Sequence, residues 1–285
     1  MKKAIVFILL GQSNAVGHAL PMEENDKIKK PLKNVFGLTR KLNQSFDNDA
    51  LTWSGYTSSE MNLGETQDDT YSVANLMAKD WQDRIDNGEN LPDLYIIHIA
   101  IGAQGVAENG MWYPEREKKL IPGALSQANI SLCPFTEHIL SLVNKSFEDI
   151  GVTPEFMGLH WRGGEQDTLV SKSHLEEVLK NIYERIFEKF YSALGKKIPV
   201  ILHKITHEER SKINGVLDSF YYINQVFEKL EEENENVKIF DVKTAPFYDD
   251  NLHDKGILQE DLVHYTRKTN AWVAEKIILD YLSKK

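Results

Sequence analysis

Short apolar runs alternate with amphipathic stretches along this chain. The runs cover residues 4–10, 94–101, 156–161, 198–205 and 237–242. Strands that are buried on both faces have nearly continuous apolar sequences of this kind. Between and after the runs, apolar side chains recur at helical spacing over residues 71–87, 136–149, 173–192, 216–232 and 267–282. Thr266 is placed to cap the last of these predicted helices.

The order strand then helix, repeated five times, predicts the fold class. Parallel strands joined by right-handed helical crossovers form a sheet with helices on both faces. We therefore expect an α/β fold, a three-layer α/β/α sandwich around a five-stranded parallel sheet. No repeat or linker divides the sequence, so residues 1–285 are expected to form a single domain. Two long connections, residues 11–70 and 103–133, follow strand carboxyl ends, where open α/β sheets bind ligands.

The N-terminal segment MKKAIVFILLGQSNAVGHA allows two interpretations. Lysines, an apolar run and small residues are typical of a secretory signal peptide. The same run can instead be the first strand of the sheet. Cleavage after the run would remove that strand, and cleavage near Ala15 or Ala19 would also remove Ser13. We therefore expect a strand, no cleavable signal and a cytoplasmic protein.

Composition narrows the classes of partner and of chemistry. The net charge of −10 argues against nucleic acid or an anionic membrane, because both bind clustered cations. No apolar run approaches the ~20 residues that span a bilayer. The single cysteine, Cys133, has no activating neighbour and is expected to be structural. His98 and His160 lie within apolar runs and are expected to be hydrogen-bonded core residues.

Polar or glycine-rich turns follow several predicted strands, and they contain a candidate catalytic set. A serine nucleophile needs a base, a group that orients the base and an oxyanion site. Ser13 is the candidate nucleophile, His264 the base and Asp261 the orienting group. The backbone N–H groups of Ser13 and of the Gly102 turn can stabilise an oxyanion. Taken singly each signal is weak, because a serine after a strand more often caps a helix.

Together the turns resemble the motif blocks of the SGNH hydrolases, and within them the sialate O-acetylesterase and acetylxylan-esterase-like carbohydrate esterases. Those proteins carry G-Q-S-N, G-G-T/S-x-I, W-H-Q-G-E-S-D and D-G-V-H blocks. The similar segments here are GQSN at 11–14, GAQGV at 102–106, WRGGEQD at 161–167 and DLVH at 261–264, in the same order. The resemblance implies the SGNH-hydrolase (flavodoxin-like) fold and a serine esterase that needs no metal or organic cofactor.

The resemblance also implies roles for individual residues. Ser13 would be the acyl nucleophile, His264 the general base and acid, and Asp261 the residue that orients His264. Further residues are candidates for oxyanion stabilisation or substrate binding. They are Gln12, Asn14, Gly102, Ala103, Gln104, Arg162, Gly163 and Glu165.

Three of these candidates depart from the family pattern. Gly163 stands where the family has a glutamine that lines the oxyanion site, so another donor is expected to compensate for a loss of ~3 kcal/mol. The candidates for that donor are Gln12, Gln104 and Arg162. Ala103 replaces the second glycine of its block, which keeps the N–H but restricts φ.

Arg162 replaces the family histidine, and two interpretations of it stay open. It can pair with Glu165 or Asp167. Alternatively it can bind a carboxylate of the substrate, such as that of a sialic acid.

We expect a serine esterase that removes O-acetyl groups from a carbohydrate, either sialic acid or a xylan-type oligosaccharide. Two alternatives stay open: a carbohydrate-binding protein on the same fold with weak catalysis, which the departure at Gly163 favours, and a lipase-like esterase. Polar connections and the aromatic residues Trp53, Trp112 and Trp161 favour a sugar over an acyl chain.

Overall fold

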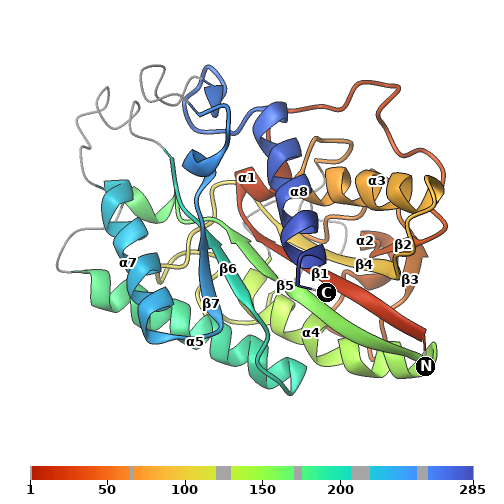
Figure 1. The fold of residues 1–285 in the computed structure, drawn as a ribbon. Coiled ribbons are helices and arrows are strands. Elements are labelled where there is room, and N and C mark those ends of the chain that lie inside the picture. Colours follow the sequence, from red (N-terminus) through yellow and green to blue (C-terminus); the bar gives the residue numbers. More distant parts are fainter. Residues whose placement is uncertain are drawn as a thin grey trace.

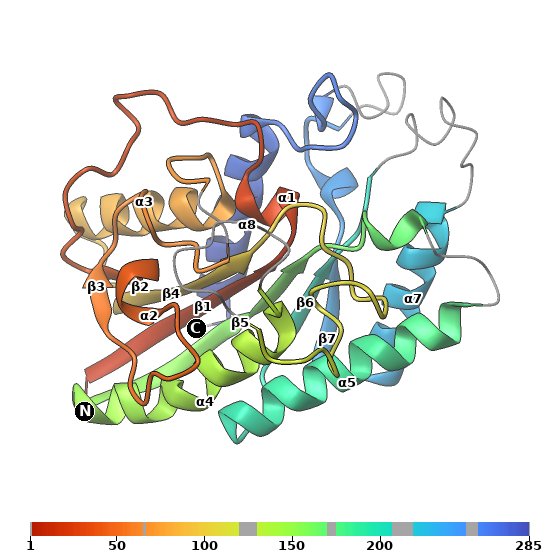
Figure 2. The same cartoon turned by 180° about the vertical axis from the view of Figure 1, so that it is seen from behind.

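A central sheet with helices on both faces organises the molecule (Figures 1 and 2). The computed structural model describes residues 2–64, 67–119, 130–169, 175–206, 219–248 and 256–284. Within these ranges, the three-layer α/β/α architecture predicted from the sequence is confirmed. None of the described helices is long and apolar enough to cross a lipid bilayer.

The described part of the sheet has seven strands in the order β3-β2-β4-β1-β5-β6-β7. They are β1 (Lys2–Gly11), β2 (Val35–Leu38), β3 (Trp53–Gly55), β4 (Asp93–Ala100), β5 (Val152–Arg162), β6 (Val200–His203) and β7 (Val237–Phe240). All neighbouring strands are parallel except β2 and β3.

The expectation of five parallel strands was wrong by two edge strands. The long connection 11–70 contributes β2 and β3, which add to the β4 edge of the sheet. These strands have four and three residues, and every residue of β3 is partly exposed. They therefore lack the continuous apolar run that marks the buried strands. These two strands are defined by their hydrogen-bonded neighbours: β2 pairs with β4, and β3 pairs antiparallel with β2.

The described helices confirm the five predicted from apolar spacing. The long helices are α3 (Val73–Asp86), α4 (Leu132–Asp149), α5 (Glu176–Leu194), α7 (Ser219–Glu233) and α8 (Arg267–Leu282). Shorter elements are α1 (Ser13–Val16), α2 (Arg40–Asn43), and the 3-10 turns η2 (Asp167–Leu169) and η4 (Val242–Thr244). Thr266 caps α8 by accepting a hydrogen bond from the Thr269 N–H at 3.2 Å. Residues 173–174 and 216–218, which the sequence assigned to helices, lie outside the described ranges.

Two apolar layers hold the helices on the sheet. One layer joins the sheet to α4, α5 and α7 through fully buried rings such as Phe135, Tyr183 and Phe227. The other joins it to α3 and α8 on the opposite face, around Trp81 and Ile278 (Figures 1 and 2). Residues 4–10 of β1 are fully buried between the layers, so their assignment to a central strand is confirmed.

The sheet topology determines where a site can form. From β1 the chain first builds strands on one side, through β4, and then on the other side from β5 to β7. The direction of winding therefore reverses at β1, and such a switch point opens a crevice at the carboxyl ends of the strands. Ser13 lies two residues beyond the end of β1, at this crevice.

Candidate active site

Three turns meet at the carboxyl end of β1. In the parallel register, Gly11 lies opposite Ala100 of β4 and opposite Arg162 of β5. Ser13, Gly102 and Gly163 therefore each follow this same level of the sheet within two residues. Hydrogen bonds to the Gly11 carbonyl, from Trp112 Nε1 at 3.1 Å and from Ile101 N–H at 3.4 Å, tie the β4 turn to this end of β1.

The turn that carries Ser13 depends on a glycine. Gly11 has φ +143°, and a Cβ there would lie 2.0 Å from the Arg162 carbonyl oxygen. This close approach lets the Gln12 N–H donate to the same carbonyl at 3.0 Å. Ser13 then begins the short helix α1, so its own N–H has no partner within the helix. That N–H is a candidate donor to an oxyanion, as the sequence predicted.

His264 and Asp261 form the expected pair. His264 Nδ1 donates to Asp261 Oδ2 at 2.6 Å, and Asp261 Oδ1 accepts the N–H groups of Val263 and His264 at 2.9 and 3.0 Å. Burial alone would raise the pKa of Asp261, but these hydrogen bonds outweigh it and lower the pKa below 3.8. An ionised Asp261 keeps the proton of His264 on Nδ1, which leaves Nε2 free to act as a base.

Asn14 joins the loop of His264 to the turn of Ser13. Its Oδ1 accepts the Tyr265 N–H at 3.0 Å, and its Nδ2 donates to the Val263 carbonyl at 3.1 Å. These bonds link residues about 250 positions apart, on either side of His264. The His18 ring also lies 4.7 Å from the His264 ring. The structure therefore brings the candidate nucleophile and the candidate base to the same rim of the sheet.

Glu165 organises the amide side chains beside Ser13. Its Oε1 accepts from Asn14 Nδ2 at 2.7 Å, and its Oε2 accepts from Gln12 Nε2. Gln12 and Asn14 are both buried, so their carboxamides are held in place by this carboxylate and are not oriented toward open solvent. Glu165, predicted to line the site, therefore supports the residues on either side of Ser13.

Known structures share this architecture. The crystal structure of NanS matches this one with a TM-score of 0.64 at 12% sequence identity, over 99% of this chain and 97% of that chain. The chain therefore has the same fold as NanS.

Two other solved proteins resemble this chain along their length. One is a member of the lipolytic protein G-D-S-L family from Veillonella parvula, with a TM-score of 0.49, 11% identity and coverage of 96% of this chain and 97% of that one. The other is the Clostridium thermocellum family 3 carbohydrate esterase, with a TM-score of 0.43, 11% identity and coverage of 99% and 98%. No protein-family model matches the sequence, and no curated protein does. A fold does not determine an activity, so the reaction depends on the residues of the site.

Two of the five described non-glycine residues with left-handed backbone lie in turns of the candidate site. Ala103, in the turn after β4, has φ +56°, and Leu262, between Asp261 and His264, also has φ +56°. Side chains other than glycine are strained there, at a cost of roughly 1 kcal/mol each. The turns therefore keep a conformation suited to glycine, and they keep it next to the candidate oxyanion donor and the candidate base.

The space at Gly163 lies beside Gln12. A Cβ at Gly163 would lie 3.3 Å from Trp161 Nε1 and 3.5 Å from Gln12 Cγ. The two glutamines predicted to replace the missing donor each donate a hydrogen bond to another group. Gln12 Nε2 donates to Glu165, and Gln104 Nε2 donates to the Gly102 carbonyl at 3.2 Å.

Arg162 is not at the substrate-binding surface. Its side chain is 1% exposed, and Nη1 donates to the Asn14 carbonyl at 3.0 Å and to Asn270 Oδ1 at 2.9 Å. It forms no ion pair with Glu165 or Asp167. Both interpretations offered from the sequence are therefore wrong. The side chain at 162 points under the catalytic turns, on the face of the sheet that carries α8, because alternate residues of a strand face opposite sides.

Asp167 fixes the turn that follows β4. Its buried carboxylate accepts the Val106 N–H at 2.9 Å and the Ala107 N–H at 3.2 Å. A Cβ at Gly105 would lie 2.2 Å from the same carboxylate, so the approach requires glycine. The sequence placed Asp167 in a motif block, and the role it suggested was pairing with Arg162. Its role in the structure depends on its burial, which arises because two turns far apart in the sequence meet in the fold.

Asp167 is expected to make stability depend on pH. Burial raises the pKa of its carboxyl from 3.8 to about 7, against the hydrogen bonds from Ala107 and Val106. The folded protein thus binds this proton more tightly than the unfolded chain, so the free energy of unfolding falls as pH rises from 3.8 to about 7. Over that range, wild type should lose up to ~4 kcal/mol relative to Asp167→Asn, which does not titrate. Urea unfolding of both proteins across the range measures this, and a constant difference would contradict it.

The burial of side chains confirms some of the other predictions from the sequence and contradicts one of them. Cys133, His98 and His160 are buried, with His98 Nε2 bonded to the Ala15 carbonyl and His160 Nδ1 to His203 Nε2, each at 3.0 Å, which confirms them as core residues. The aromatic argument for a sugar was wrong. Trp112 and Trp161 are fully buried against each other, and Trp53 packs on Tyr95 at the β3 edge.

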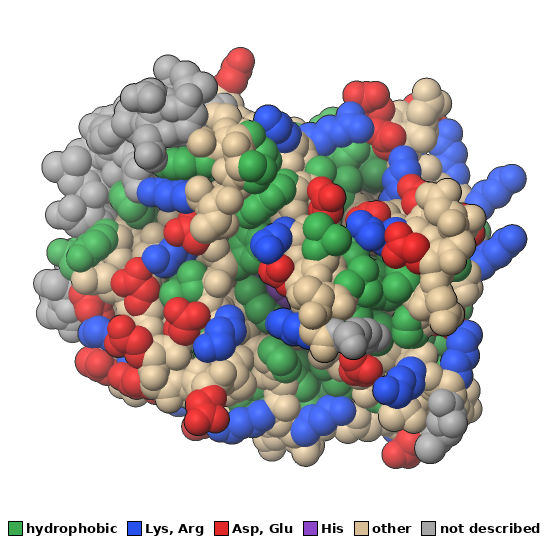
Figure 3. All heavy atoms as spheres, in the orientation of Figure 1, with side chains coloured by type: hydrophobic (Ala, Val, Ile, Leu, Met, Phe, Trp, Pro, Cys, Tyr) green, Lys and Arg blue, Asp and Glu red, His purple; other side chains and the backbone are tan. Residues whose placement is uncertain are grey.

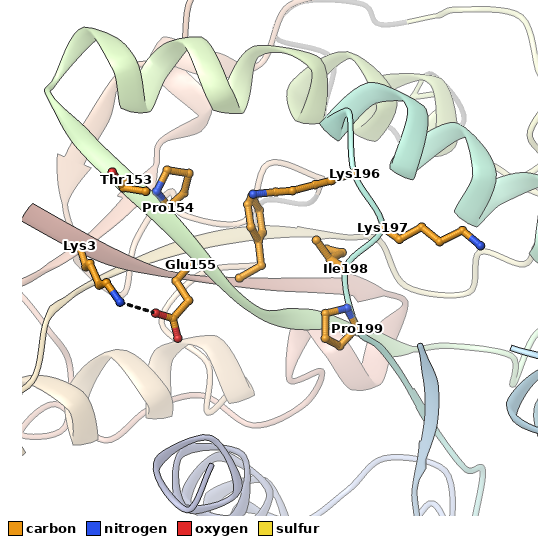
Figure 4. Close-up of a pocket in the computed structure, with 9 residues that line it drawn as sticks. Lys3, Thr153, Pro154, Glu155, Lys196, Lys197, Ile198 and Pro199 are labelled. Atoms are coloured by element: carbon orange, nitrogen blue, oxygen red, sulfur yellow. Dashed lines mark ion pairs between the residues drawn. The ribbon is translucent and has the colours of Figure 1, made fainter. Parts of the chain in front are cut away.

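The other end of the sheet holds a pocket of about 370 Å³ with no catalytic set (Figure 4). It is lined by Lys3, Thr153, Pro154, Glu155, Phe156, Lys196, Lys197, Ile198 and Pro199. Lys3 lies at the amino end of β1, roughly 26 Å along the strand from Gly11.

On the face of the molecule shown in Figure 3, acidic and basic side chains are interspersed. No three His, Cys, Asp or Glu residues are grouped to hold a metal ion in the described part of the chain.

Proposed function

We propose that this protein is a serine esterase that removes O-acetyl groups from a carbohydrate. The observation that carries the proposal is the bridge made by Asn14. It holds the Asp261–His264 pair over the turn of Ser13, and Asp261 fixes the tautomer that leaves His264 Nε2 as a base. A similarity to NanS in fold supports the proposal without carrying it.

The proposed reaction follows from these positions. His264 Nε2 takes the proton of the Ser13 hydroxyl as Ser13 Oγ attacks the ester carbonyl carbon. The Ser13 N–H and the backbone of the turn at Gly102 stabilise the oxyanion, and collapse expels the sugar hydroxyl, which takes its proton from His264. Water, deprotonated by His264, then releases acetate from Ser13. Asp261 stays ionised throughout and stabilises the imidazolium.

One feature supports a second candidate, a carbohydrate-binding protein on the same fold with weak catalysis. Gly163 supplies no side chain to the oxyanion, and the amides of Gln12 and Gln104 are engaged elsewhere. Loss of one such donor costs ~3 kcal/mol of transition-state stabilisation, or about 10²-fold in rate. The candidate therefore predicts slow turnover with retained sugar binding.

A substrate panel separates these candidates. We expect the purified protein to hydrolyse an aryl acetate and to lose activity as the acyl chain lengthens to butyrate and octanoate. Among natural esters, we expect acetate release from acetylated sialic acid or from acetylated xylo-oligosaccharides, measured by an acetate assay, with acetylated peptidoglycan fragments as a third class. Preference for octanoate would support a lipase-like esterase. Sugar binding by calorimetry with no acetate release would support the binding protein.

A further inference from the structure

The buried position of Arg162 is unfavourable for folding. The guanidinium forms no ion pair with a carboxylate of the described residues, and its Nε and Nη2 atoms have no hydrogen-bond partner. Burial lowers its pKa, yet arginine keeps its charge in proteins. A buried charge without a direct ion pair costs free energy of folding, so stability alone does not account for this residue.

No titratable group among the described residues forms a direct ion pair with this charge, and Glu165 acts on it only at a distance. His160 and His203 lie on the same face of the sheet and are hydrogen-bonded to each other at 3.0 Å. Burial, together with the Arg162 charge, lowers the pKa of His160 to about 3 and the pKa of His203 well below 6.5. Both rings are therefore neutral at ordinary pH. Glu165 is engaged by Gln12 and Asn14.

Two of the three contacts of the guanidinium lead to segments of the candidate active site. Nη1 donates to the main-chain carbonyl of Asn14, the residue after Ser13. The plane of the guanidinium lies 4.8 Å from the centre of the Tyr265 ring, and Tyr265 follows His264. The third contact, Asn270 in α8, in turn donates to the Tyr71 carbonyl before α3. A cation over an aromatic face is attracted by the quadrupole of the ring, so this contact helps to fix the position of Tyr265.

We propose that Arg162 is a positioning residue that fixes the distance and orientation of His264 relative to Ser13 from beneath. It acts below Asn14, whose side chain joins the same two segments from above. The buried charge is then retained because it constrains the two turns and not because it stabilises the fold. The inference rests on the proposed function, since it is Ser13 and His264 that are being positioned.

The test compares Arg162→Met, which removes the charge at similar volume, with Arg162→Lys, which keeps it. We expect Arg162→Met to lower kcat for an aryl acetate roughly 10- to 100-fold with KM within about twofold, because small misplacements of a base are costly in rate. Arg162→Lys should recover part of the loss. Raised KM with unchanged kcat, or unchanged kcat in Arg162→Met, would overturn the proposal.

A structural effect is separated by a matched control. Trp81 is equally buried but lies in α3 and donates to the Pro92 carbonyl, away from the site. Trp81→Phe should lower the Tm and leave kcat unchanged below the transition. A loss of kcat in Trp81→Phe equal to that in Arg162→Met would overturn the proposal. If Arg162→Met does not fold, Tyr265→Leu is the second variant. It removes the ring but keeps the hydrogen bond from the residue 265 N–H to Asn14 Oδ1, and we expect the same fall in kcat with little change in KM.

A readout without substrate keeps the inference distinct from the proposed function. The His264 Nδ1–H proton, bonded to Asp261 at 2.6 Å, should give a downfield proton resonance in wild type. We expect Arg162→Met to shift or broaden this resonance and Trp81→Phe to leave it in place. Wild type without esterase activity would contradict the proposed function, whereas an unchanged resonance in Arg162→Met would contradict the positioning role.

Discussion

Replacing Ser13 by alanine is expected to lower kcat for an aryl acetate by at least ~10⁴-fold. Without the hydroxyl no acyl-enzyme forms, and only binding and the backbone oxyanion donors assist attack by water. Ser13 begins α1, and no side-chain hydrogen bond joins it to another described residue, so the Tm should change little. The assay is release of the aryl alcohol. An electrophilic phosphonate ester is a second probe, and mass spectrometry should show that it labels wild type but not Ser13→Ala.

The matched control is Ser192→Ala, an exposed serine on α5. It should keep the activity and the labelling of wild type. Activity of Ser13→Ala within tenfold of wild type would exclude Ser13 as the nucleophile and would leave the binding protein as the better candidate.

Replacing Asp261 by asparagine is expected to lower kcat by roughly 10³- to 10⁴-fold. The carboxamide oxygen of the variant can still accept from the N–H groups of Val263 and His264, so the loop should keep its shape. The side-chain amide would then face His264 Nδ1 and donate to it. The ring proton moves to Nε2, where it blocks the base.

The measurement is kcat at a pH where wild type is fully active, together with thermal unfolding. Asp280→Asn is the control, because Asp280 is a similarly exposed aspartate in an ion pair with Lys276, at the end of α8. A fall of less than tenfold in Asp261→Asn would mean that water can replace this carboxylate. Water can reach this carboxylate, because the Asp261 side chain is 43% exposed.

The part of the fold that was predictable is the part with local patterns. Buried strands and amphipathic helices have periodicities that a sequence shows directly, and the five long helices of the described residues were all predicted. β2 and β3 were missed because short edge strands depend on a partner elsewhere in the chain. No local pattern distinguishes a three-residue edge strand from a turn.

The candidate site divides in the same way. The order of four motif blocks pointed to Ser13, Asp261 and His264, and the structure brings their segments to one rim. Arg162 was misread because charged side chains seldom lie fully inside a protein, so the sequence favoured a surface role. The role of Asp167 depends on a turn about 60 residues earlier reaching its carboxylate. Such contacts follow from the tertiary fold and leave no pattern in either segment alone.

Ala103 and Leu262 have a consequence for how this fold changes through evolution. Both residues sit in backbone that glycine adopts without strain, yet the turns keep their shape. A turn of this kind tolerates drift in residue identity for as long as the rest of the protein has stability to spare. The backbone geometry of such a turn can then persist after its glycine has been replaced.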